Sequence, residues 1–488
     1  MAKSCMVVGT SSNVGKSLVV AALCRIFKQD GWSVAPFKAQ NMSLNAYVTP
    51  DGGEIGYAQA LQAWAAGVPP RVEMNPILLK PQGNMTSQII LNGHPVGTYR
   101  AGDYYETFFD RGWQAVRDTL DRLSPEYDWL ICEGAGSPAE MNLHHRDLTN
   151  MRVAKYLQAP TLLVADIDRG GALAHVVGTL QVLPEEERQL FAGIVINKFR
   201  GVLDLLQPGL DWLEEYTGLP VVGVLPWLDF ALPAEDSMSL FEQRGSKRTA
   251  QIEIAVIRLP HIANFTDFDP LAAEPTVRVR FVGLNESLGS PDVAILPGSK
   301  ATIADLMALQ ESGMAEQLQR FSGAIAGICG GMQMLGQAIA DPAGYEGPSG
   351  KFRGLGLLPL ETQLTGEKVT RQVSTSDRWL GESPILGYEI HQGRTTFGHS
   401  ARRMFERDDL GCVSADDRVW GSYLHGLFDN HAWRRQWLNR LRMAKSLRPL
   451  PELAGHYSED RDRLLDRLAE IWRPQLDLKV LGYHSKLT

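Results

Sequence analysis

The stretch SCMVVGTSSNVGKSLVVAALCRIF, residues 4–27, decides the fold of the first half of the chain. Residues 4–10 predict a short buried strand, and residues 16–30 predict a helix. The loop between them leads from a strand into a helix, so backbone amides and the positive helix end are available to a phosphate group. Its Gly-Lys-Ser ending is typical of a phosphate-binding loop, although five residues rather than the usual four separate Gly9 from Gly15.

The loop supplies the residues that a nucleotide site needs. Lys16 is expected to reach the outer phosphates, and the hydroxyl of Ser17 is expected to hold Mg²⁺. Gly-Lys-Ser also occurs in ordinary turns, but its place between a strand and a helix favours ATP binding. The residues predicted to line the nucleotide are Thr10, Ser11, Asn13, Val14, Gly15, Lys16 and Ser17.

Two other strand ends fit the same ATP site. Glu133 ends a buried run before a Gly-Ala-Gly turn, where its carboxylate would hold Mg²⁺ together with Ser17. The alternative is a solvated glutamate at a strand end. Asn197 and Lys198 end another buried run, and an Asn-Lys pair there is typical of purine contacts in related nucleotide folds. An ordinary turn residue is the alternative for Asn197.

Short buried strands alternate with helical segments through the first half, which predicts a parallel sheet covered on both faces. A polar stretch, 234–250, interrupts the alternation and predicts a linker, after which a second series of strands begins. The predicted strands are 4–10, 128–134, 159–166, 191–198, 220–226, 252–260, 277–283, 293–299 and 324–330, and the predicted helices include 16–30, 56–67 and 172–182. The predicted domains are an ATP-binding domain at 1–233, a second α/β domain at 251–445 and a helical C-terminal extension at 446–488.

The composition argues against several classes of protein. The 488 residues are 44% hydrophobic and 21% charged, as in globular proteins, and allow two or three domains. No apolar run is long enough to cross a membrane, and the N-terminus lacks the apolar stretch of a signal peptide, so we expect a cytoplasmic protein. The five scattered cysteines fit a reducing compartment and have no zinc-type spacing. A net charge of −8 without a basic run argues against a nucleic-acid partner.

The second half carries a candidate nucleophile. Cys329 follows an apolar strand and precedes two glycines and a helical run, a sharp turn that exposes a thiol at a helix N-terminus. His425 follows another apolar run far downstream, and folding can bring such a cysteine and histidine together as nucleophile and base. Backbone amides at Gly298, within LPGSK, and at Gly330 are expected to form the oxyanion hole.

These residues resemble the glutaminase domain of the class I, or triad, glutamine amidotransferases. The resemblance implies that Cys329 attacks the carboxamide of glutamine, releases ammonia and is freed by hydrolysis. The usual triad has an acidic residue two positions after the histidine, but Leu427 stands there in this chain. The chain is in this respect similar to the cobyrinate-type amidotransferases, which lack that acid. Glu389 and His391 are both candidates to orient His425 instead.

The whole chain resembles the cobyrinate amidases, and among them the cobyric acid synthase family. Its long phosphate loop is similar to those of dethiobiotin synthetase and the cobyrinate amidases. In the related cobyrinic acid a,c-diamide synthases, a stretch of Gly-Pro-Asp type follows the lysine that opens the first segment of the resemblance. In this chain the lysine is Lys38, and QNMSLN stands at that place. The segments that carry the resemblance keep their order over nearly the whole chain: KAQNMSLNAYVT (38–49), EIGYAQALQA (54–63), MNPILLKP (74–81), EGAGSPAEMNL (133–143), DIDRGG (166–171), LPGSK (296–300) and GYEIHQGRT (387–395).

The resemblance implies a fold and a reaction. The fold is α/β: a parallel-sheet P-loop domain similar to dethiobiotin synthetase, followed by a triad-type glutamine amidotransferase domain. The reaction is amidation of the b, d, e and g carboxylates of adenosylcobyrinic acid a,c-diamide, a corrinoid, through an acyl phosphate. It would use ATP, Mg²⁺ and ammonia from glutamine.

Three alternatives to this reaction remain open from the sequence. One is cobyrinic acid a,c-diamide synthase, and another is a related amidoligase that acts on a different polycarboxylate. The third is an ATPase switch or a partner-binding protein with an inactive glutaminase half, against which the intact pair of Cys329 and His425 counts.

Charged residues near strand ends are candidates to contact the corrinoid carboxylates or the migrating phosphoryl group. Arg146 and Asp147 follow soon after Glu133, and Asp168 and Arg169 follow another predicted strand before a glycine pair. An ordinary cluster of surface ion pairs is the alternative for each of these four residues.

Overall fold

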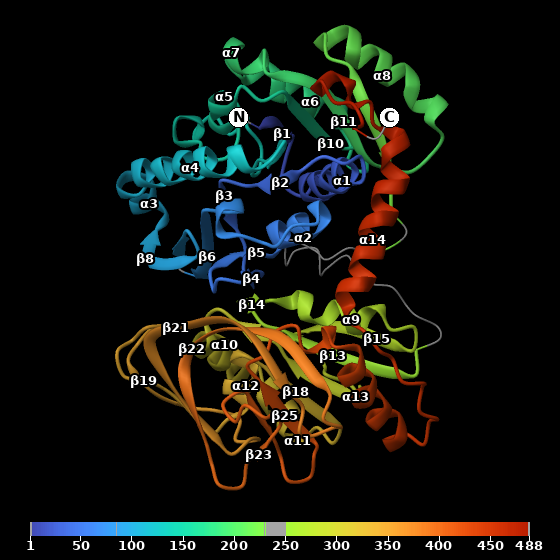
Figure 1. Ribbon diagram of the computed structural model, residues 1–488. Coiled ribbons are helices and arrows are strands. Elements are labelled where there is room, and N and C mark those ends of the chain that lie inside the picture. Colours follow the sequence, from blue (N-terminus) through green and yellow to red (C-terminus); the bar gives the residue numbers. More distant parts are fainter. Residues whose placement is uncertain (1, 84, 229, 231–249, 487–488) are drawn as a thin grey trace.

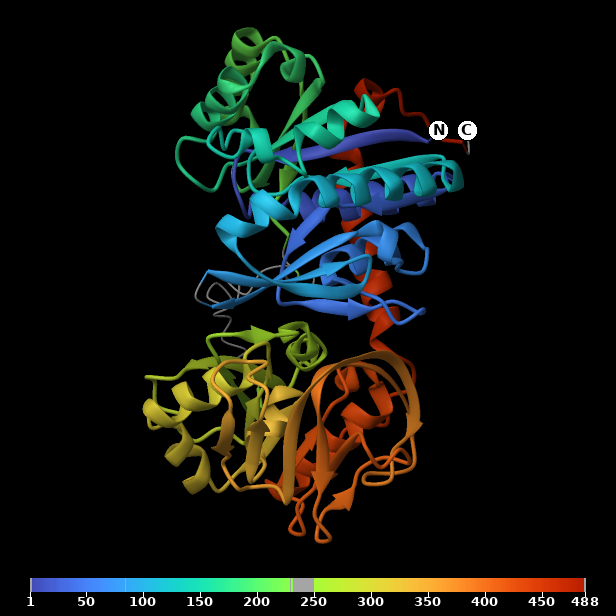
Figure 2. The same ribbon diagram turned by 90° about the vertical axis from the view of Figure 1, so that its left-hand side faces the viewer.

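The computed structural model describes residues 2–83, 85–228, 230 and 250–486. Two α/β halves lie one above the other, and the chain returns from the lower half to end beside its start on the upper half (Figure 1, Figure 2). The linker predicted at 234–250 lies outside the described residues except for its last position. Within the described ranges, no helix is both long and apolar enough to span a membrane.

The upper half is built on a six-stranded parallel sheet of order β12-β11-β10-β1-β9-β2. β1 lies at the point where the strand order reverses, and the loop after such a strand opens towards a ligand at the carboxyl edge of the sheet. The strands are β1 (Lys3–Gly9), β2 (Val34–Phe37), β9 (Trp129–Glu133), β10 (Thr161–Asp166), β11 (Phe191–Phe199) and β12 (Val221–Pro226).

Both faces of this sheet are covered by helices because successive side chains of a strand point to opposite faces. In β1, Cys5 and Val7 pack in one apolar layer, whereas Met6 and Val8 pack in the other. The first layer includes α1 (Lys16–Gln29) and α2 (Tyr57–Ala66). The second includes α4 (Phe109–Leu123), α5 (Met151–Leu157), α6 (Ala172–Val182) and α8 (Leu203–Thr217).

A second, smaller sheet of the upper half lies next to the lower half (Figure 1). It has the order β3-β6-β7-β8, and a hairpin of β4 and β5 lies beside it. These strands were not predicted from the sequence, because three of them are only three residues long and β8 has mostly exposed side chains. The strands are β3 (Gln40–Met42), β4 (Ala46–Val48), β5 (Glu54–Gly56), β6 (Ile77–Gly83), β7 (Thr86–Leu91) and β8 (His94–Arg100).

The lower half has a seven-stranded sheet of order β15-β13-β16-β18-β25-β24-β23, in which β15 to β25 are parallel. A long antiparallel ribbon of β21 (Leu360–Ser376) and β22 (Pro384–Phe397) reaches up to β4 of the upper half. The other strands are β13 (Ile252–Arg258), β14 (Ile262–Ala263), β15 (Val277–Gly283), β16 (Val293–Leu296), β17 (Gly298–Ser299), β18 (Ala324–Ile328), β19 (Ala338–Asp341), β20 (Gly350–Arg353), β23 (Arg402–Arg403), β24 (Gly411–Val413) and β25 (Val419–Ser422). The helices include α9 (Asp269–Ala273), α10 (Thr302–Glu311), α11 (Met314–Arg320), α12 (Gly330–Leu335) and α13 (His431–Ala444).

The last helix, α14 (Tyr457–Trp472), leaves the lower half and runs up the side of the molecule (red in Figure 1). Its Leu465 and Trp472 are fully buried in the apolar layer that α1 and α2 form on the six-stranded sheet. Arg25 of α1 donates from Nε to Asp466 Oδ1 at 2.8 Å. The C-terminal segment therefore covers one face of the upper half, which carries the phosphate loop, rather than standing apart from it.

The α/β fold class predicted from the sequence is confirmed, since a half built on a parallel sheet with a strand–loop–helix start precedes a second α/β half. The predicted strand at 293–299 is divided into β16 and β17. Pro297 stands between the two strands, and proline lacks the N–H that a continuous ladder requires.

Truncation of Trp472 to alanine should loosen the upper half. The side chain is 1% exposed, so its loss should lower the free energy of unfolding by about 3–5 kcal/mol. Trp212→Ala, at a tryptophan that is 46% exposed on α8, is the matched control and should cost far less. Denaturant unfolding of both variants measures the difference, and equal small effects would show that α14 does not hold the nucleotide half together.

Candidate active site

The loop between β1 and α1 turns at two residues with left-handed backbone conformation. Asn13 has a φ of 61° and Gly15 a φ of 98°. A Cβ atom at Gly15 would lie 2.1 Å from Asn197 Nδ2, so only glycine fits there. Thr10 N donates to Val164 O of β10 at 3.0 Å, which ties the start of the loop to the sheet.

Lys16, Ser17 and Glu133, predicted separately from the sequence, are brought together beside this loop. Lys16 Nζ donates to Ser11 O and to Gly136 O, at 3.0 Å each. Ser17 Oγ donates to Glu133 Oε1 at 2.8 Å. The hydroxyl and the carboxylate that were predicted to share Mg²⁺ are therefore neighbours.

Two partners of Glu133 were missed by the sequence analysis. Lys38 Nζ lies 2.8 Å from Glu133 Oε1, and both side chains are buried. Gln62 of α2 donates from Nε2 to Glu133 Oε2 at 2.5 Å. The place of Lys38 directly after β2, at the carboxyl edge of the sheet, is the signal that would have found it. With Lys16, the cluster has two ammonium groups and one carboxylate, a positive balance that suits phosphate groups.

Asn197 lies under the phosphate loop. Its Nδ2 donates to Val14 O at 2.7 Å, and its Oδ1 accepts the backbone N–H of Lys198 at 2.8 Å. Lys198 Nζ contacts Asn13 O at 2.9 Å and Asp166 Oδ2 at 2.8 Å. Asn197 therefore helps to hold the loop through Nδ2, while its Oδ1 bonds the next residue of β11. The predicted contact of Asn197 with a purine stays a prediction.

The four candidates for the corrinoid have different surroundings. Asp147 accepts backbone N–H groups of Thr149, Asn150 and Arg152 at 2.8–3.0 Å, so it caps the start of α5. Arg146 lies in the short 3₁₀ turn just before that cap. The side chains of Asp168 and Arg169 are about half exposed near the end of β10: Arg169 Nε lies 3.6 Å from Asp166 Oδ2, and Asp168 Oδ2 lies 3.8 Å from Arg200 Nη2.

Cys329 stands at the sharp turn between β18 and α12. Its φ of 52° and ψ of −111° are rare for a residue with a side chain, and such strain is concentrated at functional sites. A Cβ at Gly331 would lie 2.0 Å from Leu296 O, so the turn needs glycine. Cys329 is 6% exposed, and its Sγ lies 3.3 Å from Ile390 O.

His425 follows β25 and is held by an acidic residue that the sequence analysis missed. Asp267 Oδ2 lies 2.7 Å from His425 Nδ1, and Asp267 Oδ1 accepts the N–H of Gly426 at 2.9 Å. Burial lowers the pKa of His425, but attraction to Asp267 and hydrogen bonds with Asp267 and Cys329 outweigh burial and raise it to about 10. The raised pKa favours the protonated form of the imidazole, which is the form that can give a proton to a leaving group.

Neither residue suggested from the sequence orients His425. Glu389 contacts His391 Nε2 at 3.1 Å and Arg371 Nε at 2.5 Å, so the two candidates pair with each other rather than with His425. Asp267 lies in a 3₁₀ turn, η5 (Phe265–Phe268), 158 positions before His425. No local spacing could have indicated it, because only the tertiary fold brings the two segments together.

Cys329, His425 and the two glycines predicted for the oxyanion hole line one enclosed pocket of about 40 Å³. A Cβ at Gly298 would lie 3.3 Å from His425 Cε1, and one at Gly330 would lie 3.1 Å from Ser299 N. Lys80, from β6 of the upper half, also lines this pocket. The cysteine is therefore enclosed by both halves of the protein.

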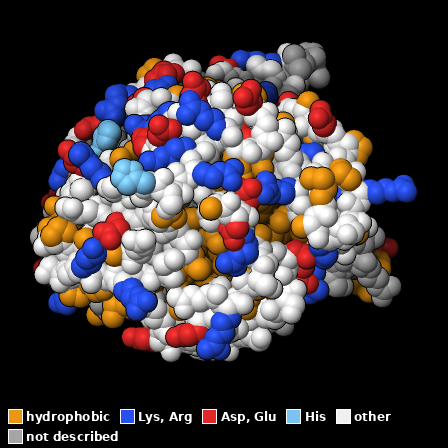
Figure 3. All heavy atoms as spheres, turned by 90° about the horizontal axis from the view of Figure 1, so that it is seen from below, with side chains coloured by type: hydrophobic (Ala, Val, Ile, Leu, Met, Phe, Trp, Pro, Cys, Tyr) orange, Lys and Arg blue, Asp and Glu red, His pale blue; other side chains and the backbone are white. Residues whose placement is uncertain are grey.

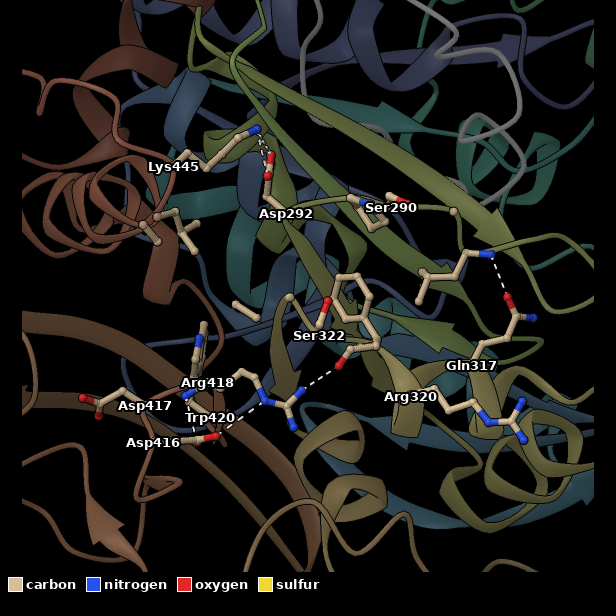
Figure 4. A pocket seen from close by; sticks show the side chains of 18 of the residues that line it. Ser290, Asp292, Gln317, Arg320, Ser322, Asp416, Asp417, Arg418, Trp420 and Lys445 are labelled. Carbon is tan, nitrogen blue, oxygen red and sulfur yellow. Dashed lines mark hydrogen bonds and ion pairs between the residues drawn. The ribbon is translucent and has the colours of Figure 1, made fainter.

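A larger cavity of about 1040 Å³ lies at the opposite, amino edge of the seven-stranded sheet. On the lower face of the molecule, Lys and Arg side chains are interspersed with Asp and Glu (Figure 3). Within the cavity Lys445 pairs with Asp292, and Arg418 lies 3.6 Å from Asp416 (Figure 4). These charges largely neutralise one another, and the cavity is lined by neither Cys329 nor His425, so it is not the candidate active site.

A Cys–His–Asp triad on a strand-to-helix turn, joined to a P-loop half, defines a glutamine amidotransferase with its own nucleotide-binding domain. Two family models match accordingly: the CobQ/CobB/MinD/ParA nucleotide binding domain at residues 5–239 and the CobB/CobQ-like glutamine amidotransferase domain at 253–433. The chain belongs to the cobyric acid synthase family, enzymes of glutamine-dependent amidation in cobalamin biosynthesis.

Similarity to relatives along nearly their full length supports this assignment. The chain is 66% identical to a cobyric acid synthase of Synechococcus sp. (strain JA-2-3B'a(2-13)), with 98% of this chain and 99% of the relative covered. It is 63% identical to one of Gloeobacter violaceus, with 99% of each covered. Among solved structures, PurLQS from Thermotoga maritima is 16% identical and covers 39% of this chain and 99% of its own, with a TM-score of 0.31.

Replacement of Gly15 by alanine should weaken nucleotide binding. The new Cβ would meet Asn197 Nδ2, and the left-handed backbone costs about 1–2 kcal/mol with a side chain, so affinity for ATP should fall about tenfold or more. Gly218→Ala is the control, because that glycine is also left-handed but its Cβ would meet open space. Titration with ATP compares the two variants, and an unchanged affinity in Gly15→Ala would contradict the assigned loop geometry.

Replacement of Asp267 by asparagine should strongly reduce glutaminase activity. The amide keeps the size of the side chain but removes its charge, so the pKa of His425 should fall and glutamine hydrolysis should drop about 10²–10⁴-fold. Hydrolysis is measured as glutamate release across pH, with Asp416→Asn at the opposite edge of the sheet as control. Wild-type activity with an unchanged pH profile would exclude Asp267 from the triad.

Proposed function

We propose that the protein amidates the b, d, e and g carboxylates of adenosylcobyrinic acid a,c-diamide, with ATP and glutamine, to give adenosylcobyric acid. Full-length similarity to cobyric acid synthases supports the corrinoid substrate. The observation that carries the proposal is the pocket of Cys329, since Lys80 of the nucleotide half helps to enclose it. Ammonia formed there starts between the two halves, next to the half that binds ATP.

In the glutaminase half, the thiolate of Cys329 attacks the carboxamide carbon of glutamine. His425 gives its proton to the departing nitrogen, so ammonia leaves and a thioester forms. The neutral imidazole then accepts a proton from the water that attacks the thioester, and glutamate is released. Asp267 holds Nδ1 and keeps the imidazole in the required orientation. Amides near Gly298 and Gly330 stabilise the oxyanion of each tetrahedral intermediate.

In the nucleotide half, the corrinoid carboxylate must first become electrophilic, because a carboxylate does not react with ammonia. Transfer of the γ-phosphoryl group of ATP gives an acyl phosphate, from which ammonia displaces phosphate and forms the amide. The position of Lys16 on two loop carbonyls supports this step, since phosphate oxygens would take over these bonds. Lys16 and Lys38 would neutralise charge on the transferring group.

Ser17 and Glu133 suit Mg²⁺. This ion takes oxygen ligands and is usually held by one or two protein groups together with phosphates and water. Their oxygens lie 2.8 Å apart, and the described part of the chain has no cluster of three or more His, Cys, Asp or Glu that could cage a metal. When bound, the ion would offset the negative charge of the phosphates.

For the corrinoid itself, Arg169 is the strongest of the four candidates. Arg169 is about half exposed and pairs with Asp166, which also binds Lys198 beside the phosphate loop. A guanidinium there would meet a substrate carboxylate close to the nucleotide. Asp168 stays a candidate for the phosphoryl-transfer site because its partner, Arg200, could contact the migrating phosphoryl group. The bonds by which Asp147 caps α5 favour a structural role for Asp147 instead.

Replacement of Cys329 by alanine tests whether glutamine hydrolysis and amidation take place at separate sites. With glutamine, ATP and adenosylcobyrinic acid a,c-diamide, the wild type should add four amides, as followed by mass spectrometry. The variant should lose this activity but keep amidation driven by ammonium salts, because the nucleotide half is intact. Cys412→Ala, at a second buried cysteine of the same half that does not line the pocket of Cys329, is the control. Loss of the ammonia-driven reaction in Cys329→Ala would contradict two separate sites, and a substrate that gains no amide would contradict the assigned corrinoid.

A further inference from the structure

Glutamine brings more than a carboxamide into the pocket of Cys329. Its other end carries an α-carboxylate and an α-ammonium group, and both lose water on entering the pocket. Buried charges without partners are costly, so a selective pocket should offer one fixed cation and one fixed anion to this end. The mechanism derived above uses neither.

The cations that line the pocket differ in their partners. Lys80 and Lys368 both contact the carboxylate of Glu54, Lys80 at 2.5 Å. His425 is paired with Asp267 at 2.7 Å. Lys300 lines the same pocket, but its Nζ has neither a hydrogen bond nor an ion pair within 4.0 Å among the described residues.

Lys300 also lies next to a part of the expected oxyanion hole. It follows β17, the two-residue strand that carries Gly298 of the expected oxyanion hole, and its backbone N–H donates to His261 O at 3.0 Å. A carboxylate held by its ammonium group would therefore lie in a fixed relation to the oxyanion site and to the thiol. Burial and repulsion from Lys368 and Lys80 lower the pKa of Lys300. Attraction to Glu346 and Glu54, neither of which forms an ion pair with Lys300, opposes this lowering of the pKa only in part, so an anionic ligand would supply a closer countercharge.

Glu346 provides the opposite charge. It lines the same pocket, and its Oε2 accepts the N–H of Ile303 at 3.2 Å in the first turn of α10. Among the described residues no cation lies within 4.0 Å of its carboxylate. Burial raises the pKa of Glu346 although attraction to Lys300 and backbone hydrogen bonds oppose the shift, so a cationic group closer than Lys300 would stabilise this carboxylate.

We propose that Lys300 binds the α-carboxylate of glutamine and that Glu346 binds its α-ammonium group, so that the two residues select the amino-acid end of the substrate. The proposal rests on the glutaminase function of the Cys329 pocket and assigns the specificity of that pocket. Lys300 and Glu346 hold the substrate and take no part in bond making. Their loss should therefore act mainly on KM for glutamine and little on kcat.

The test pairs a protein variant with a truncated substrate. Lys300→Met should lower kcat/KM for glutamine about 10- to 100-fold, as expected for one charge-assisted hydrogen bond, chiefly through KM. 4-Aminobutanamide, which is glutamine without its α-carboxylate, should be hydrolysed equally by the wild type and by this variant. Glu346→Gln should behave in the same way towards glutaramic acid, which lacks the α-ammonium group.

Two controls separate a binding role from a folding defect. Lys351→Met, at an exposed lysine on β20 that pairs with Glu361, should leave KM unchanged. Ammonia-driven amidation should be normal in all variants, because it bypasses the pocket. An unchanged KM in Lys300→Met, or an equal loss on glutamine and on 4-aminobutanamide, would overturn the proposal. Absence of glutamine hydrolysis in the wild type would instead contradict the proposed function.

Discussion

The active pocket depends on one buried carboxylate that the two halves share. Glu54, from the β4–β5 hairpin, is fully buried and contacts Lys80 of its own half and Lys368 of the lower ribbon. Burial raises the pKa of Glu54, but attraction to the two lysines outweighs it and lowers the pKa to about 2. Removal of one partner from such a buried pair costs about 3–5 kcal/mol, so the halves are held at one spacing. At that spacing Lys80 closes the pocket over Cys329.

A second set of contacts makes the triad itself dependent on the nucleotide half. Asn45 Oδ1 accepts the N–H of Phe265 at 3.0 Å, and Asn264 donates from Nδ2 to Ala46 O at 2.8 Å. These bonds fix the start of η5, which carries Asp267. The residue that orients His425 is therefore anchored from the other half of the protein. Asn45 also contacts α2, because Tyr57 N, at the start of α2, donates to Asn45 O at 3.1 Å. From α2, Gln62 donates to Glu133. A continuous chain of contacts thus joins the ATP site to the glutaminase triad.

The two sites follow the same structural rule. In a parallel sheet, ligands bind at the carboxyl ends of strands, where loops and helix N-termini converge. The phosphate loop follows β1 and Glu133 ends β9 in the upper half, whereas Cys329 follows β18 and His425 follows β25 in the lower half. The carboxyl edge of the lower sheet faces the upper half, since Lys80 lines the pocket of Cys329. The orientation of the lower sheet therefore places Cys329 next to the nucleotide half.

The sequence by itself determined the elements and residues whose signal is local. Buried strands read as continuous apolar runs, and the phosphate loop and Cys329 lie on strand-to-helix turns whose glycines and neighbours are adjacent in the chain. The tertiary structure alone decided what comes from distant segments: Asp267 on His425, Lys38 and Gln62 on Glu133, and α14 on the nucleotide half. Each of these contacts joins residues without a fixed spacing. Their energy comes from burial and charge pairing, which exist only once the sheets have formed and the two halves have met.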